Sequence, residues 1–275
     1  MSLPSASVIV RALDSRADLQ ALLPVLRRQT VPAELVVVDS GSRDGSVEIA
    51  TSLSDRLLHL APGTYSPGRS LNLGAGNASG EVLLALSSHC RPPAEDWIER
   101  CLRHYARPDV GATNGASRDP QGRPLAGIFY QDGAHARANA HWGFSNHASS
   151  FRAEAWREDP FDEELVTSED RLWAVGATAR GWVIAHDPLL CVGQAHRYKQ
   201  GVPTFFRRER TEMLVIGANV AIPPYPFSDL VRDWWSDVPR NDRYPPSVHR
   251  FLNYRRAAGL AGRYLGHRQA RHIRR

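Results

Sequence analysis

A run of polar residues, Ser87, Ser88, His89 and Cys90, follows an apolar segment in the stretch VLLALSSHCRPP. The apolar part predicts a buried strand, so hydroxyls, an imidazole and a thiol stand at a strand tip. Such groups can bind a ligand, ligate a metal or transfer protons, although an ordinary polar loop accounts for them equally. The chain's three cysteines lack CxxC spacing, which argues against a disulfide framework or a cysteine zinc site.

A second loop, VVVDSGSRDGS, carries acids directly after another apolar segment. Asp39 closes the predicted strand, Ser40 and Gly41 are small enough for a ligand to approach the backbone, and Asp44 follows. We predict that Asp39 and Asp44 accept hydrogen bonds from a base or a ribose. The alternative is a strand-to-helix turn with Asp44 near a helix cap. The loop has neither a GxGxxG nor a GK[ST] pattern.

Alternating strands and helices must position both loops. The expected strands are residues 7–13, 35–38, 57–60 and 81–87. Helical patterns separate these strands, and the third predicted helix ends at Gly80. This alternation indicates a parallel sheet covered on both faces, whose ligands bind beyond the carboxyl ends of the strands. Those strand ends are residues 11–14, 39–44 and 87–91.

After residue 110 the alternation is less regular, and Gly, Asn, His and aromatic residues become frequent. The segment HWGFSNHASSFR supplies Trp142, Asn146 and His147, which could stack on and hydrogen-bond to a sugar or another cyclic acceptor. Core packing explains the aromatic residues equally well. The stretch SEDRLWAVGATARG predicts a helix, and WVIAH and LLCVGQAHRY predict two further strands.

The net charge of +5 belongs to the end of the chain, because residues 244–275 carry eight arginines and no acid. A nucleic-acid enzyme would more often carry its basic surface around the active site, so we expect no nucleic-acid partner. Phe251, Tyr254 and Leu265 lie on one predicted helical stripe. The C-terminal helices could contact a membrane surface, form a homodimer or pack on the rest of the chain. With no apolar run of about 18 residues and no signal-peptide pattern, we expect a cytoplasmic protein, with a membrane-peripheral position as the alternative.

The order of the motifs SVIVRAL, ELVVVDSGSRDGS, GRSLNLGAGNASGE, LSSHCRP and SEDRLW resembles family 2 of the inverting glycosyltransferases, particularly rhamnosyltransferase-like bacterial members. The resemblance covers roughly residues 6 to 200. It implies the α/β GT-A fold, a Rossmann-like, mostly parallel central sheet flanked by helices, with a C-terminal helical extension. We predict a catalytic domain at residues 1–202, with a nucleotide-sugar half (1–110) and an acceptor half (111–202), and a helical extension at 203–275.

The resemblance also implies roles for individual residues. Asp170 matches the catalytic base of the family's acidic pair, and Glu169 stands beside it; both could otherwise be the charged first turn of a helix. The residues implied in nucleotide-sugar binding are Arg11, Ala12, Asp14, Asp39, Ser40, Gly41, Asp44, Arg69, Asn72, Ser88 and His89. The residues expected on the acceptor side are Trp142, Asn146, His147 and Trp173.

Relatives carry a DxD-type acidic motif where this chain has LSSHC. In those relatives the acid helps to hold a divalent cation against the diphosphate, so another group must take over here. One possibility is that His89 and His196 are imidazole ligands of a cation such as Mn²⁺ or Mg²⁺, Mn²⁺ being the better match for imidazole. A second is metal-free neutralisation by Arg69 and Arg91. A third is that His89 only hydrogen-bonds to the sugar, or that His196 is a core residue.

The implied activity is transfer of a sugar from a UDP-, dTDP- or GDP-sugar to a hydroxyl of a sugar, a lipid-linked molecule or a small molecule, by single in-line displacement. Two other functions remain open. A sugar nucleotidyltransferase can share a similar sheet, but its basic, glycine-rich loop is missing from VRALDSRADL. A noncatalytic sugar-nucleotide-binding or scaffold protein would explain the missing DxD motif, whereas the Glu169-Asp170 pair argues for catalysis.

Overall fold

The computed structural model describes residues 2–194, 201–236 and 246–273. The chain forms two compact units, one of residues 1–136 and 142–195 and the other of residues 137–141 and 196–275. The second unit also includes a short segment that no sequence signal indicated, and the domain boundary predicted at residue 202 stays a prediction.

The first unit is built on a sheet that has eight strands within the described residues, in the order β3-β2-β1-β4-β8-β6-β9-β7. Its strands are β1 (Ala6–Ala12), β2 (Glu34–Asp39), β3 (Arg56–His59), β4 (Val82–Ser87), β6 (Val110–Gly115), β7 (Phe129–Gln131), β8 (Ala148–Arg152) and β9 (Val183–Asp187). Strands β8 and β7 run antiparallel to their neighbours, and the other pairs are parallel. The sheet is therefore mostly parallel, as predicted. A separate ribbon pairs β5 (Cys90–Arg91) with β10 (Gly193–Gln194).

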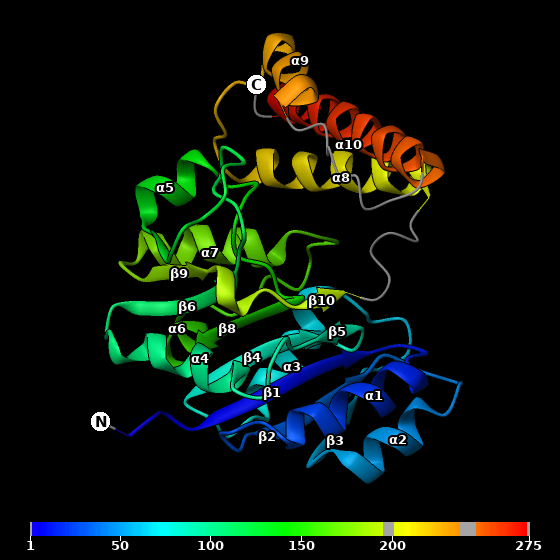
Figure 1. Ribbon diagram of the computed structural model, residues 1–275, viewed down its shortest axis with the longest axis vertical. Helices are drawn as coiled ribbons and strands as arrows, with labels where there is room; N and C mark the ends of the chain where they lie inside the picture. Colours follow the sequence, from blue (N-terminus) through cyan, green and yellow to red (C-terminus); the bar gives the residue numbers. More distant parts are fainter. Residues whose placement is uncertain (1, 195–200, 237–245, 274–275) are drawn as a thin grey trace. The chain divides into compact units, whose positions relative to one another are not determined.

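Side chains alternate along each strand, so apolar residues project from both faces of this sheet and helices cover both faces. Val8 and Val10 of β1 face a core that includes α1 (Arg16–Arg27), α2 (Ser46–Leu53) and α4 (Trp97–Arg103). Ile9 faces the opposite core, which includes residues of α3 (Pro67–Gly76), α6 (Ala153–Glu158) and α7 (Glu169–Ala179). Figure 1 shows α1 and α2 beside the blue strands β1 and β2. The remaining short helices are α5 (Gly133–Ala138), η1 (His104–Ala106) and η2 (Pro188–Leu190).

Helix α3 ends at Gly76, one turn earlier than the predicted end at Gly80. A side chain at Gly80 would collide with the backbone of Ser7 in β1, so this glycine lets the chain pass close to β1 just before β4. Within the helix, a Cβ on Gly74 would lie 2.4 Å from a methyl carbon of Ile9. The small residues of SLNLGAG therefore let α3 pack tightly on β1.

The second unit contains three helices in its described part, α8 (Val202–Asn219), α9 (Phe227–Ser236) and α10 (Pro246–Ile273). Helices α8 and α10 pack together through glycines, since a Cβ on Gly262 or Gly266 would meet the backbone of α8. Tyr254 and Leu265, which the sequence places on one apolar stripe, are 66% and 42% exposed. The contact with α8 is made by the glycine face of α10, and a membrane or homodimer contact of the stripe stays a prediction. Every described helix is too short or too polar to span a bilayer.

Candidate active site

The carboxyl ends of β1, β2 and β4 meet at one edge of the sheet. In the register of these parallel strands, Ala12 pairs with Asp39 and Arg11 pairs with Ser87. Antiparallel β8 begins at the same edge, where the Ser87 N–H donates to the His147 carbonyl at 2.9 Å. The topology thus gathers three strand ends predicted to bind a ligand and one segment predicted to face an acceptor.

The loops after β1 and β2 are tied together by their aspartates. Asp14, which has a φ of 44°, accepts a hydrogen bond from the Arg43 N–H at 2.8 Å. Asp44 accepts from the Arg16 N–H at 2.9 Å and from the Ser46 hydroxyl, and these bonds hold the pKa of Asp44 below its usual range. Both carboxylates therefore shape the loops in which the sequence places ligand contacts.

Asp39 is buried at the end of β2, with only 2% of its surface exposed. Its carboxylate accepts hydrogen bonds from the N–H groups of Gly41 and Ser42, and His59 Nδ1 lies 3.6 Å away. Ala12 is buried beside it, whereas Ser40 is half-buried and Gly41 is exposed with a φ of 100°. The open surface here belongs to Ser40 and Gly41, so a ligand could approach their backbone.

The turn after β4 contains the Ser-Ser-His-Cys motif. Ser88 is buried and its hydroxyl donates to the Ser15 hydroxyl at 3.0 Å, while His89 is half-buried. Arg91 donates to the carbonyls of this turn and forms an ion pair with Asp18 at 2.9 Å. A diphosphate that used Arg91 would have to compete with Asp18.

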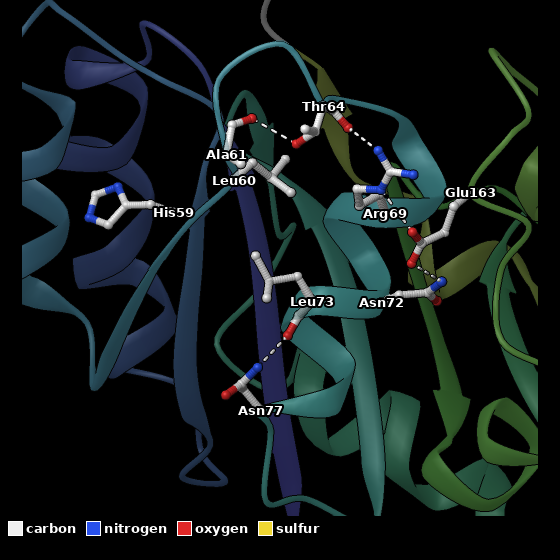
Figure 2. Close-up of a pocket in the computed structure, with 9 residues that line it drawn as sticks. All are labelled: His59, Leu60, Ala61, Thr64, Arg69, Asn72, Leu73, Asn77 and Glu163. Atoms are coloured by element: carbon white, nitrogen blue, oxygen red, sulfur yellow. Dashed lines mark hydrogen bonds and ion pairs between the residues drawn. The ribbon is translucent and has the colours of Figure 1, made fainter.

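A groove of about 580 Å³ lies beside α3 and the loop that follows β3. Figure 2 shows Arg69 and Asn72 of α3 directed toward Glu163, and His59 pointing away from them. Arg69 pairs with Glu163 at 2.8 Å and donates to the Thr64 carbonyl. The contact with the Glu163 carboxylate raises the pKa of Arg69. The Arg69 guanidinium, like that of Arg91, already has an acidic partner.

Asn72 pins the segment that follows β8 and α6. Its amide nitrogen donates to Phe161 O and to Glu163, and its amide oxygen accepts from Trp156 Nε1 and the Phe161 N–H. Both amide hydrogens and the oxygen are engaged within the protein, which indicates that Asn72 positions this segment. Its predicted contact with the sugar nucleotide stays a prediction.

We expect Asn72→Ala to lower the free energy of unfolding by about 3 kcal/mol, because it leaves the Trp156 and Phe161 groups without partners. Urea unfolding followed by circular dichroism measures this change. Asn77→Ala is the matched control at the C-cap of α3, since the exposed Asn77 side chain donates to Leu73 O; its effect should stay within about 0.5 kcal/mol. Equal effects of the two variants would contradict the pinning role of Asn72.

The acidic pair begins α7. Asp170 is half-buried, and its carboxylate accepts a hydrogen bond from the Asn146 N–H at 3.1 Å and one from the Arg171 N–H at 2.8 Å. The Asn146 carbonyl accepts from the Arg11 guanidinium at 2.9 Å. Arg11, Asn146 and Asp170 come from three distant parts of the sequence, and the fold joins them through one backbone segment at the sheet edge.

Glu169 is 5% exposed beside Asp170. Burial raises the pKa of Glu169 to about 7, and the nearby charge of Asp170 adds to this effect, while Arg11 and Asn146 oppose it. Glu169, beside Asp170, can therefore hold a proton near neutral pH. Such a pair can accept a proton from a hydroxyl group.

The predicted acceptor residues separate into two groups. Trp173 is 4% exposed, packs against Phe144 and Phe161 and donates its indole N–H to Asp159 O. Trp173 is therefore a core residue, and its predicted place near an acceptor stays a prediction. Asn146 is also buried, whereas Trp142 and His147 are half-buried on either side of it in the chain.

The metal prediction rests on His89 and His196, and His196 lies outside the described residues. Among the described residues, no three His, Cys, Asp or Glu side chains form a group that could hold a metal ion. The cation site predicted from His89 and His196 therefore stays a prediction.

Two residues that contribute to the geometry of the candidate site had no clear sequence signal. Glu163 holds both Arg69 and Asn72, but nothing in its local sequence indicates a long-range ion pair. Ser168 precedes the acidic pair with a φ of 65°, and its buried hydroxyl has no hydrogen-bond partner among the described residues. A serine before two acids predicts a helix start, but the left-handed backbone is visible only in the structure.

Relatives of known class share much of this chain. Glycosyltransferase AglE of Haloferax volcanii is 28% identical over 218 residues, which are 69% of this chain and 67% of AglE. O-antigen chain rhamnosyltransferase RfbN of Salmonella typhimurium is 23% identical over 194 residues, 64% of this chain and 62% of RfbN. The chain thus spans less than two thirds of the length of RfbN.

Solved structures share the fold. Mannosyltransferase PcManGT from Pyrobaculum calidifontis, in complex with GDP-Man and Mn²⁺, has a TM-score of 0.62 at 18% identity, covering 99% of this chain and 74% of that chain. Glucosyl-3-phosphoglycerate synthase from Mycobacterium tuberculosis, in complex with Mn²⁺, UDP and glucosyl-3-phosphoglycerate, has a TM-score of 0.60 at 14% identity, covering 80% of this chain and 81% of that chain. These likenesses establish the GT-A fold.

The family model described as glycosyl transferase family 2 matches residues 7–158, more than half of the sequence. This match covers the strands β1, β2 and β4 that form the site edge and ends before the acidic pair. Together with the glycosyltransferase relatives, it identifies the enzyme class. The chain is a glycosyltransferase that belongs to glycosyl transferase family 2.

Proposed function

We propose that this enzyme is an inverting transferase that moves a sugar from a nucleotide-diphospho-sugar to an acceptor hydroxyl by a single in-line displacement. The observation that carries the proposal is the position of Asp170. Its half-buried carboxylate is held by the Asn146 N–H at the edge where β1 and β4 end. A general base must lie within reach of the proton that it removes, and this edge is where ligands of parallel sheets bind.

In the proposed step, the acceptor oxygen attacks the anomeric carbon while its proton passes to the Asp170 carboxylate. The bond from the anomeric carbon to the diphosphate oxygen breaks, and the nucleoside diphosphate leaves with the electron pair. Attack opposite to the leaving group inverts the anomeric configuration. Trp142 and His147, half-buried beside Asn146 in sequence, are our candidates for acceptor contacts.

The base and ribose of the donor are assigned to the loops after β1 and β2. The exposed backbone at Gly41 and the half-buried Ser40 offer the approach that a nucleoside needs. Similar folds are solved with GDP-Man or UDP, and with Mn²⁺. Since His89 is the one described member of the predicted imidazole pair, we route no step through a cation and treat its requirement as a measurable property.

The test is turnover of a donor panel. We expect calorimetry to show selective binding of UDP, dTDP or GDP, and the enzyme to release that diphosphate from its sugar in the presence of an acceptor hydroxyl. Each titration is run with chelator, Mn²⁺ and Mg²⁺, and proton NMR of the product reports the anomeric configuration.

Each alternative has its own outcome in this experiment. A retained configuration would overturn the in-line displacement. Pyrophosphate release from a nucleoside triphosphate and a sugar phosphate would indicate a nucleotidyltransferase. Binding without turnover across the donor and acceptor panel would favour a noncatalytic role.

A further inference from the structure

Arg11 differs from the other two arginines near the predicted donor site. Arg69 pairs with Glu163 at 2.8 Å, and Arg91 pairs with Asp18 at 2.9 Å. Arg11 has no carboxylate within ion-pair distance among the described residues, although it is half-buried. A half-buried guanidinium without a direct counter-ion is costly, so its charge calls for a functional explanation.

The contacts of Arg11 lead to the acidic pair. Its guanidinium donates to the Asn146 carbonyl at 2.9 Å, and the N–H of the same residue donates to Asp170 at 3.1 Å. Its positive charge also favours the ionised form of Glu169. Arg11 is therefore linked to one carboxylate through a backbone segment and to the other through its charge.

The strand that carries Arg11 is well suited to fix a position. Arg11 lies in β1, paired on one side with Val38 of β2 and on the other with Ser87 of β4. Asn146 is 1% exposed, so the segment that it anchors is also enclosed. A site built on rigid elements holds its reacting groups more precisely than one built on loops alone.

We propose that Arg11 is a positioning residue for the acidic pair: it holds the Asn146 backbone that orients Asp170, and its positive charge acts on Glu169. This inference rests on the proposed function of Asp170 as the base. It gives Arg11 a different role from the donor contact that the sequence predicts. The difference between these two roles can be measured.

The first experiment compares Arg11→Met and Arg11→Lys with the wild-type enzyme. For Arg11→Met we expect kcat to fall by about 10²-fold, because the base loses its alignment. Removing the positive charge disfavours the ionised form of Glu169, so the acidic limb of the kcat/KM profile should move to higher pH. Arg11→Lys retains the charge and should keep the position of that limb.

Calorimetry with UDP, dTDP and GDP separates the two roles of Arg11. A positioning residue should leave the Kd of the preferred nucleoside diphosphate unchanged in Arg11→Met. Arg103→Met is the control for loss of a surface arginine, since Arg103 is 71% exposed and pairs with Glu99 on α4; it should change neither kcat nor the pH profile. Weakened diphosphate binding with an unmoved pH profile would make Arg11 a donor contact and overturn the proposal.

A stability measurement tests the inference even if no sugar nucleotide is turned over, which would refute the proposed function itself. Arg11→Met is compared in the wild-type and Glu169→Gln backgrounds by urea unfolding at pH 8 and pH 5. We expect Arg11→Met to shift the midpoint more in the wild-type background at pH 8, where Glu169 is ionised, and equally in both backgrounds at pH 5. If Arg11→Met shifts the urea midpoint equally in the two backgrounds at pH 8 as well as at pH 5, the charge of Arg11 does not act on Glu169.

Discussion

Asp170→Asn is expected to lower kcat by about 10³-fold while the preferred nucleoside diphosphate still binds. The asparagine amide is nearly the same size as the carboxylate, and its oxygen can still accept the Asn146 N–H bond seen in the structure. It cannot take a proton from the acceptor hydroxyl near neutral pH. The loss should therefore appear in turnover and not in the Kd measured by calorimetry.

Asp109→Asn is a matched control for this substitution, because Asp109 is an aspartate in a surface ion pair with Arg107, 45% exposed. It should retain wild-type turnover. Full activity of Asp170→Asn would exclude Asp170 as the base and direct attention to Glu169. Loss of nucleotide binding together with turnover would instead assign Asp170 to the donor.

Glu169→Gln is expected to gain stability relative to the wild-type enzyme as the pH rises. The pKa of Glu169 is raised in the folded protein to about 7, from an ordinary value of 4.5. Below the ordinary value both states hold the proton, and between the two values the unfolded chain releases it first. The wild-type protein therefore loses stability over this window, and the neutral glutamine does not.

The size of the effect follows from the separation of the two pKa values. Between pH 4 and pH 8, the difference in unfolding free energy should move by about 3 kcal/mol in favour of Glu169→Gln. Urea unfolding at a series of pH values measures it. Glu81→Gln is the control, because hydrogen bonds from the Ser5 N–H and hydroxyl lower the pKa of Glu81. This variant should lose stability relative to the wild-type protein as the pH rises, the opposite of Glu169→Gln. A pH-independent difference for Glu169→Gln would show that this carboxylate is not held protonated.

The central strands could be predicted closely because their signal is local. Runs of Val, Ile and Leu fix β1, β2 and β4 to within a residue or two of the expected ranges. The predicted strand LLCVGQAHRY is largely wrong in its described part, because the 3-10 helix η2 takes up Leu189 and Leu190 and only Gly193–Gln194 are in a strand.

The order of the strands could not be predicted beyond β4. Strand β8 follows β7 along the chain, yet it lies between β4 and β6. This pairing depends on contacts between Leu83 and Phe151, which are far apart in the sequence and carry no local pattern. The sequence therefore indicated short strands in this half without their positions.

The site was predicted in part, for a related reason. The family resemblance indicated Asp170 and Glu169, and the structure places them beside each other at the start of α7. The link from Arg11 to Asp170 runs through the backbone of Asn146, so it leaves no trace in residue type. The sequence predicts that Trp173 packs near an acceptor, which stays a prediction, while its burial among Phe144 and Phe161 is visible only in the structure.

The antiparallel direction of β8 has a consequence for how this enzyme can diverge. Strand β8 starts at the edge where β1 and β4 end. At this edge the segment before β8 therefore leads into a strand, whereas the loops after β1 and β4 follow theirs. The segment before β8 can thus change length or composition without altering any connection between β1 and β4. The proposed acceptor side and donor side are therefore separate in chain connectivity and meet at the Arg11–Asn146 hydrogen bond, so acceptor preference could evolve in the rest of this segment while the nucleotide-binding loops stay constant.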